Sequence, residues 1–282
     1  MPDRWHGKCP VVEVGDIGPD TDWTSALIGI ESIIHTAARV HITNELSLDP
    51  LTDFRRVNVD GTLGLARQAA KAGVKKFIFL SSIKVNGEFT KDGEPFTEES
   101  PLCPEDSYGI SKLEAEQGLR NIAEISDMKI IIIRPVLVYG PGVKGNFLSL
   151  IRLIKLGIPL PFGAINNARS FIALDNLIDF ILVCLNHPVA ENKTFIVSDG
   201  EDISTLELIQ ILSSAVKVKS RIIPIPISII LFVARLLGRV DIARRLCCNL
   251  QVDISKAEKL LGWTPPMNIR DGLVRAIAQA AS

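Results

Sequence analysis

The chain has 282 residues, of which 47% are hydrophobic and 22% charged. This composition excludes a disordered chain, a collagen-like repeat and a small secreted scaffold, and it fits one large domain or two interleaved ones. The 31 Lys and Arg residues against 32 Asp and Glu residues give a net charge of −1. Because there is no basic excess to neutralise phosphates, we expect no nucleic-acid partner.

Cysteine usage indicates a reducing compartment. The five cysteines are odd in number and none has C-x-x-C spacing, so we predict reduced thiols and a cytoplasmic location. The four histidines are scattered and none has zinc-type spacing to a cysteine, so we expect no metal site. The residues before Pro10 lack the apolar region of a signal peptide.

The first half of the chain alternates short apolar runs with helical patterns. In chain order, the patterns predict a strand within 30–38, a helix over 53–72, a strand at 76–82, a helix over 107–125 and a strand at 129–135. Strands that are apolar on both faces and alternate with helices are typical of a parallel sheet covered on both sides. We therefore predict an α/β fold with a doubly wound, Rossmann-like parallel sheet, whose ligands bind beyond the carboxyl ends of the strands.

After residue 140 the pattern changes to helices at 147–155, 174–185 and 206–216, with one short strand at 194–198. We predict an incomplete dinucleotide-binding domain over residues 1–140. A smaller, mostly helical substrate-binding lobe over 141–282 would be partly interleaved with it.

One apolar stretch, 222–237, is interrupted by Arg235 and is too short to span a bilayer. No transmembrane segment is expected. We interpret the stretch as a buried or partner-facing helix rather than as a helix that contacts a membrane surface.

Tyr108 and Lys112 lie four residues apart at the start of a predicted helix, so the ammonium can lie near the phenol. A nearby cation favours the phenolate and lowers its pKa, which makes Tyr108 a general base or acid for a substrate hydroxyl. The alternative is a chance pair on a helix surface. Ser82, at the end of the preceding strand, can hydrogen-bond the same hydroxyl, whereas we interpret Ser81 as a loop-capping serine.

From about Val11 to its end, the chain resembles the nucleotide-sugar epimerases and dehydratases of the extended short-chain dehydrogenase/reductase family. The resemblance rests on several motifs that occur in the family's order. They are Asp16-Ile17, His35-Thr36-Ala37-Ala38, Asn58-Val59-Asp60-Gly61-Thr62, the trio Ser82, Tyr108 and Lys112, Arg134-Pro135 followed by Val138-Tyr139-Gly140-Pro141-Gly142, Arg169, and the closing segment 250–263.

The resemblance implies NAD as the cofactor, with NADP as the alternative, a nucleotide-sugar substrate and a homodimer. It implies that Ser82, Tyr108 and Lys112 are catalytic. The cofactor-binding residues that it implies are Asp16, Ile17, Thr36, Ala37, Ala38, Asn58, Leu80, Tyr108, Lys112 and Pro135. The substrate-binding residues that it implies are Ser82, Lys84, Tyr108, Asn146 and Arg169. For Asn146 a simple helix N-cap is the alternative, and for Arg169 a surface ion pair.

Three departures from the family pattern bear on function. The G-x-x-G-x-x-G loop is absent from the sequence, so we expect a truncated form of a longer enzyme, an expectation that tight NAD binding by this chain alone would refute. Ile83 and Lys84 stand where the 4,6-dehydratases place an Asp-Glu pair, which makes dehydration improbable. Leu137 stands where many epimerases carry a substrate-contacting Asn.

The segment 81–87 resembles the branch of the family that acts at C4 in bacterial surface-polysaccharide synthesis. We therefore predict an NAD-dependent nucleotide-sugar 4-epimerase that acts on a UDP-hexose or UDP-N-acetylhexosamine by transient C4 oxidation. Two alternatives stay open. One is an NAD(P)H-dependent 4-keto reductase of a UDP-deoxysugar, and the other is an inactive fragment or non-catalytic binding module.

Overall fold

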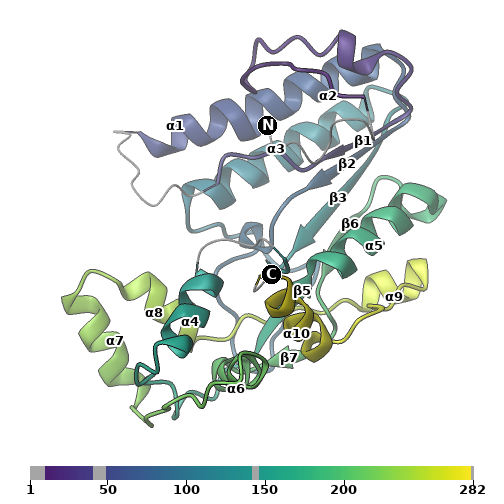
Figure 1. Cartoon of the computed structure of the whole chain (residues 1–282). Helices are drawn as coiled ribbons and strands as arrows, with labels where there is room; N and C mark the ends of the chain where they lie inside the picture. Colours follow the sequence, from purple (N-terminus) through teal and green to yellow (C-terminus); the bar gives the residue numbers. More distant parts are fainter. Residues whose placement is uncertain (1–9, 41–48, 142–145, 281–282) are drawn as a thin grey trace. The chain divides into compact units, whose positions relative to one another are not determined.

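The computed structural model describes residues 10–40, 49–141 and 146–280 (Figure 1). The chain forms two compact units that are interleaved along the sequence. The first unit comprises Met1–Ser81, Pro104–Ile132 and Glu191–Lys193, and the second comprises Ser82–Cys103, Ile133–Ala190 and Thr194–Ser282.

A four-stranded sheet has the order β1-β2-β3-β6. Its strands are β1 (Ser32–His35), β2 (Lys76–Leu80), β3 (Lys129–Pro135) and β6 (Thr194–Val197). β1 and β2 run parallel, with Ser32 opposite Lys76 and His35 opposite Phe79. Every residue of β3 after Lys129 is buried, as expected of a strand covered on both faces. The predicted strand at 129–135 is therefore confirmed to the residue.

The helix that the sequence predicted over 53–72 is a continuous helical run over 50–71 in the structure. α1 (Pro50–Arg55) passes through a π-helical segment (Arg56–Gly61) into α2 (Thr62–Lys71). The Asp49 side chain accepts a hydrogen bond from the Thr52 amide at 3.3 Å and caps the start of α1.

α3 (Ser107–Glu124) begins where the Asp106 side chain accepts a hydrogen bond from the Gly109 amide at 2.7 Å. α3 lies beside α1 and α2 (Figure 1). The first unit has its own apolar core, built from the inward faces of α2 and α3 and from β2 and β3. Its members include Leu65, Phe77, Phe79, Leu119 and Ile132.

The second unit contains a three-stranded sheet that the sequence did not predict. Its order is β4-β5-β7, with β4 (Leu137–Tyr139), β5 (Arg169–Ala173) and β7 (Asp202–Ile203). β4 and β5 are parallel, whereas β5 and β7 are antiparallel. The description of this part as mostly helical is incomplete, because strands of two to five residues are too short for an alternating pattern to identify them.

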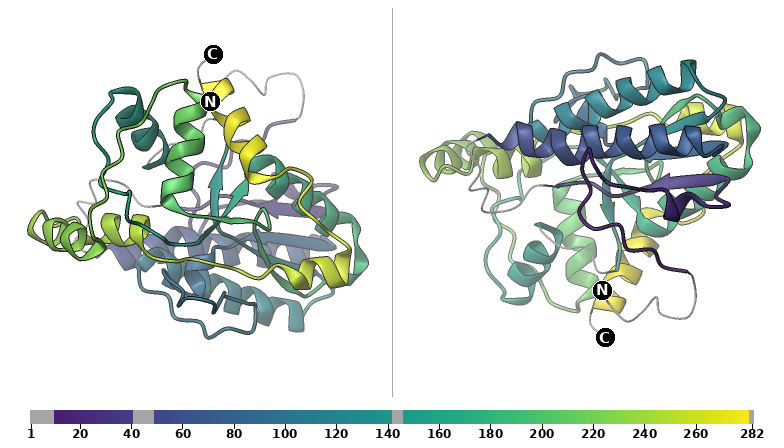
Figure 2. Two further views of the ribbon diagram at one scale, coloured as in Figure 1. Left: turned by 90° about the horizontal axis from the view of Figure 1, so that it is seen from below. Right: turned by 90° about the horizontal axis from the view of Figure 1, so that it is seen from above.

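The second unit also contains the helices after β4 (Figures 1 and 2). They are α4 (Asn146–Lys155), α5 (Leu174–Asn186), α6 (Thr205–Ala215), α7 (Ile227–Leu236), α8 (Val240–Cys247), α9 (Ser255–Leu261) and α10 (Ile269–Ala280). A second apolar core joins α4, α6 and α10 to β5. In the described part of the chain, no helix is both long and apolar enough to cross a bilayer.

Candidate active site

Lys112 is a buried ammonium next to Tyr108 in the first unit. Its side chain is 1% exposed, and Nζ donates a hydrogen bond to the carbonyl oxygen of Leu80, at the end of β2, at 2.8 Å. Nζ also lies 4.4 Å from the ring centroid of Phe79 and 5.9 Å from that of Tyr108. The carboxyl end of β2 and the first two turns of α3 therefore bring this cation and this phenol together.

Burial sets the protonation of both groups. It raises the pKa of Tyr108 to about 12, and the negative charge of Asp106 acts in the same direction. It lowers the pKa of Lys112 to about 8, against the opposing effect of the Glu116 carboxylate. The sequence-based expectation of a lowered phenol pKa is therefore wrong for this structure, because burial outweighs the attraction to the ammonium.

Glu116 interacts mainly with groups other than Lys112. It accepts hydrogen bonds from the Ser81 hydroxyl at 2.6 Å and from Arg120 at 2.9 Å. Within the described ranges, no carboxylate lies within ion-pair distance of the Lys112 ammonium. Ser81 thus has a structural partner of its own, and Lys112 is a buried cation held by a neutral carbonyl.

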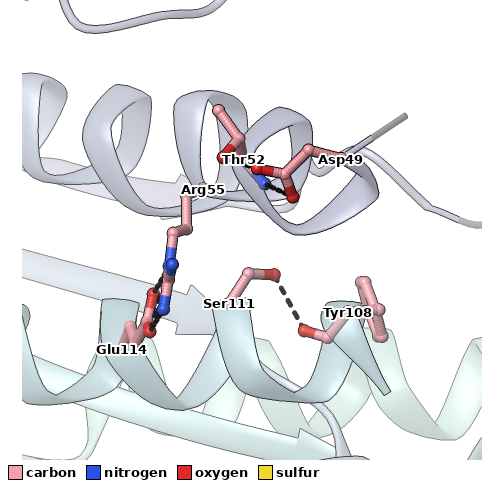
Figure 3. A network of polar contacts seen from close by, with 6 residues as sticks. All are labelled: Asp49, Thr52, Arg55, Tyr108, Ser111 and Glu114. Carbon is pink, nitrogen blue, oxygen red and sulfur yellow. Dashed lines mark hydrogen bonds and ion pairs between the residues drawn. The ribbon is translucent and has the colours of Figure 1, made fainter. Parts of the chain in front are cut away.

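Asn58 connects three parts of the first unit. Its amide nitrogen donates to the Arg39 carbonyl at 3.0 Å and to the Ser111 hydroxyl at 2.9 Å, and its oxygen accepts from the Arg39 amide at 2.7 Å. The Ser111 hydroxyl in turn donates to the Tyr108 carbonyl at 2.8 Å (Figure 3). This network fixes the first turn of α3 against the segment that follows β1.

A second connection joins α1 to α3. Arg55 and Glu114 point toward each other, with Nε donating to Oε2 at 2.8 Å (Figure 3). Both side chains are partly exposed, so solvent screens this ion pair and it adds little to the stability of the fold. It connects α1 to α3, the helix that carries Tyr108.

Other predicted cofactor-binding residues also gather in the first unit. Ile17 packs on Gly61, where a Cβ would come within 2.7 Å of Ile17 Cγ2, so the Asp16-Ile17 segment approaches the helical run only because residue 61 is glycine. Thr36 and Ala37 follow the end of β1 and are exposed, whereas Ala38 is half-buried.

These residues fit part of a dinucleotide. Small exposed side chains after a parallel strand leave room for a flat ring system, and the Lys112 ammonium provides a donor for ribose hydroxyls. That Asp16 and Ile17 hold the adenine and Lys112 the nicotinamide ribose stays a prediction from the family resemblance. The sequence contains no G-x-x-G-x-x-G segment for the pyrophosphate between them.

The remaining predicted residues belong to the second unit. Ser82 caps a short 3₁₀ turn (Ile83–Val85) by accepting a hydrogen bond from the Lys84 amide at 3.3 Å, and its side chain is half-buried. Pro135 ends β3 and is buried. Because Tyr108 and Lys112 lie in the first unit, the assembly of Ser82 with them stays a prediction.

Lys84 and Arg169 contribute to a group of charged residues. The Lys84 ammonium lies 2.6 Å from Glu88, which also pairs with Arg245 at 3.3 Å. Arg169 is buried and donates to the Cys248 carbonyl at 2.9 Å. Burial lowers the pKa of Arg169 to about 10, partly opposed by Glu88.

Arg169 is not a surface residue, so the interpretation as a surface ion pair is wrong. None of the carboxylates that the structure describes lies within ion-pair distance of its guanidinium. For Asn146, α4 begins at this residue, but its side chain is outside the described part of the chain. Both residues therefore keep their predicted substrate roles as proposals.

Sequence reasoning missed the residues that position the named ones. Ser111 lies three residues after Tyr108, on the same helical face, and this spacing was a usable signal. Asn86 carried no such signal. Its oxygen accepts a hydrogen bond from Arg134 at 3.1 Å, and its nitrogen donates to the Thr97 carbonyl at 3.4 Å, which organises the loop after Ser82.

Comparison with known proteins identifies the family. Residues 11–198 match the NAD dependent epimerase/dehydratase family. A UDP-glucose 4-epimerase of Vibrio cholerae is 48% identical over 269 residues, which cover 95% of this chain and 82% of that protein. The chain therefore belongs to the NAD dependent epimerase/dehydratase family, and the enzyme class and the NAD cofactor predicted from the resemblance are confirmed at the level of the family.

Solved structures confirm the fold. The structure of RMD from Pseudomonas aeruginosa complexed with NADPH has a TM-score of 0.76 at 22% identity, over 97% of this chain and 90% of that one. MoeE5 in complex with UDP-glucose and NAD has a TM-score of 0.75 at 21% identity, over 95% of this chain and 84% of that one. The predicted Rossmann-like α/β class is correct.

Proposed function

We propose that this protein is an NAD-dependent 4-epimerase of a UDP-hexose or a UDP-N-acetylhexosamine. The observation that carries the proposal is the buried Lys112 ammonium beside Tyr108. A buried cation without a carboxylate partner costs stability, and such groups cluster at catalytic sites. The 48% identity to a UDP-glucose 4-epimerase supports the epimerase class.

The proposed chemistry centres on the Tyr108 hydroxyl. Bound NAD supplies reversible uptake of the C4 hydride. Tyr108 Oη takes the proton of the C4 hydroxyl as the carbonyl forms, and returns it to O4 when hydride comes back to the other face. Lys112 stabilises the phenolate and holds the ribose, and Ser82 Oγ hydrogen-bonds the same substrate oxygen.

The raised pKa of Tyr108 adds a condition to this scheme. With a pKa of about 12, the phenol stays protonated at neutral pH in the structure described here. Proton uptake from the sugar therefore needs surroundings that favour the phenolate; the Lys112 ammonium contributes to them, and bound NAD would add positive charge. We expect the phenolate to form more readily with NAD bound than in its absence.

The second unit offers a place for the substrate diphosphate. Lys84, Arg169 and Arg245 are three cations that interact with the Glu88 carboxylate. One N–H group of the Arg169 guanidinium donates to the Cys248 carbonyl, and its other N–H groups can donate to phosphate oxygens. We propose that this group binds the diphosphate and that the uridine and sugar extend from it.

Incubation of UDP-glucose or UDP-N-acetylglucosamine with the protein and a tenth of an equivalent of NAD tests the proposal. We expect the C4 epimer to form in many-fold excess over NAD, with Tyr108→Phe as the inactive control. Product formation only with a 4-keto sugar and one equivalent of NAD(P)H would identify the reductase instead. No turnover of any of these substrates by the wild-type protein would contradict the epimerase.

Three further properties stay proposals. A homodimer is tested by sedimentation velocity. A cytoplasmic location is tested by cell fractionation of the native protein. A role in surface-polysaccharide synthesis is tested by the sugar composition of the polysaccharide after disruption of the gene.

A further inference from the structure

α7 exposes an apolar stripe to solvent. Ile229, Phe232, Val233 and Leu236 lie at the i, i+3, i+4 and i+7 positions of one helical face, and they are 51%, 64%, 46% and 72% exposed. Leu237, directly after the helix, is 69% exposed. The opposite face of α7 packs inward through Ala234, which is buried, and through Ile230. The sequence predicted a buried or partner-facing helix; this face is not buried, and a partner for it stays a prediction.

α8 lies beside α7 in the second unit and continues this surface (Figures 1 and 2). Ile242 of α8 is also exposed. Between the two helices is a shallow hollow lined by Ser228, Leu231, Phe232, Arg235, Val240 and Arg244. We call α7, α8 and the turn between them the apolar hairpin.

The apolar hairpin belongs to a strongly basic segment of a nearly neutral chain. Residues 217–245 contain seven Lys or Arg residues and one acidic residue, a net charge of +6. The rest of the chain has 24 basic and 31 acidic residues, a net charge of −7. Positive charge is thus concentrated in the segment that carries the exposed stripe.

Two arginines border the stripe and remain accessible. Arg235 and Arg239 are exposed, and neither has a carboxylate within ion-pair distance among the residues that the structure describes. Arg244, which lines the hollow together with Arg235, is exposed and lies over the Phe89 ring, 4.7 Å from its centroid. Long arginine side chains at the edge of an apolar face can reach phosphates while the apolar groups enter a hydrocarbon layer.

We propose that the apolar hairpin docks on the surface of an anionic lipid bilayer, with the stripe of α7 in the interfacial layer and the arginines on lipid phosphates. Helices with one apolar face and a basic border bind membranes in this way without crossing them. Charge selects this occupant over a second copy docked through the same face, because the exposed Arg235, Arg239 and Arg244 of the two copies would repel one another. The proposal does not depend on the proposed epimerase activity.

Flotation with lipid vesicles tests this proposal. We expect the purified protein to float with vesicles of 70% phosphatidylcholine and 30% phosphatidylglycerol, and at least tenfold less with phosphatidylcholine alone. Raising the salt from 0.1 M to 0.5 M should weaken binding severalfold, because screening acts on the arginine–phosphate contacts.

Two double variants separate the apolar and basic contributions. Phe232→Ser with Leu236→Ser, and Arg235→Glu with Arg239→Glu, should each reduce binding to the anionic vesicles at least tenfold. The matched controls are Ile125→Ser and Lys91→Glu, which change an exposed isoleucine and an exposed lysine elsewhere and should float like the wild type. Thermal unfolding of each variant shows that its fold is retained.

Several results would overturn the proposal. The first is absence of flotation with anionic vesicles, and the second is flotation that the serine variant leaves unchanged. A third is a dimer in vesicle-free sedimentation that the serine variant dissociates while vesicles stay unbound, which would assign the stripe to a second copy. Retention on immobilised polyglutamate without vesicle binding would assign it to an acidic protein.

Discussion

The buried ammonium of Lys112 should give the stability of this protein a distinct dependence on pH. Its pKa falls from 10.5 to about 8 on folding, because burial penalises the charged form. Between these two pH values the unfolded state holds one proton more than the folded state. The free energy of unfolding therefore rises with pH, by up to 1.36 kcal/mol per unit and by about 3 kcal/mol over the whole window.

Replacement of Lys112 by Met removes this titration and keeps most of the side-chain volume. The difference in unfolding free energy between wild type and Lys112→Met should change by about 3 kcal/mol between pH 7.5 and pH 10.5, in favour of the wild type as pH rises. Burial raises the pKa values of three other groups, which lowers the free energy of unfolding at high pH; they are Tyr108, Cys184 and Cys247. Because both proteins contain these groups, their effect cancels in the difference.

Urea unfolding followed by tryptophan fluorescence at pH 7.5, 8.5, 9.5 and 10.5 measures this difference. Lys71→Met, at an exposed lysine at the end of α2, is the matched control, and its difference from wild type should stay constant across the series. A constant difference for Lys112→Met as well would refute the reasoning, because Lys112 would then titrate alike in the folded and unfolded states.

Three further predictions concern single residues. Tyr108→Phe should lower kcat at least a hundredfold with little change in Tm. If the variant keeps half of the wild-type kcat, Tyr108 does not transfer the proton. Arg169→Gln should raise KM for the nucleotide sugar about tenfold or more while kcat changes less, whereas an unchanged KM would place the diphosphate elsewhere. Asn58→Ala removes three hydrogen bonds, two with the Arg39 backbone and one with the Ser111 hydroxyl, so it should lower the free energy of unfolding by about 2–4 kcal/mol in urea titrations. A loss below about 0.5 kcal/mol would mean that water replaces the amide.

Local patterns in the sequence predicted the main elements of the fold well. β3 was predicted to the residue because four consecutive isoleucines lie between Lys129 and Arg134-Pro135. α3 was predicted within one residue because Asp106 and Ser107 mark its start. β5, in contrast, is five residues long and begins with Arg169-Ser170, and it becomes a strand only through its pairing with β4 and β7.

Long-range contacts and burial account for what the sequence could not show. Asn58 and Ser111 are 53 residues apart, so no local pattern connects them. The direction of the Tyr108 pKa shift depends on how far the phenol is buried, which spacing along a helix does not reveal. The apolar stretch that became α7 was interpreted as buried or partner-facing, and its sequence could not decide between these, because burial depends on whether another element covers the helix.

Isotope tracing at C4 tests the central claim most directly. UDP-glucose that carries deuterium at C4 is incubated with the protein and a small fraction of an equivalent of NAD, and the product is analysed by NMR and mass spectrometry. Transient oxidation at C4 predicts UDP-galactose that retains the deuterium at C4, with no net accumulation of NADH. Product that has exchanged this deuterium for solvent hydrogen, or epimerisation that proceeds with all NAD removed, would contradict the account.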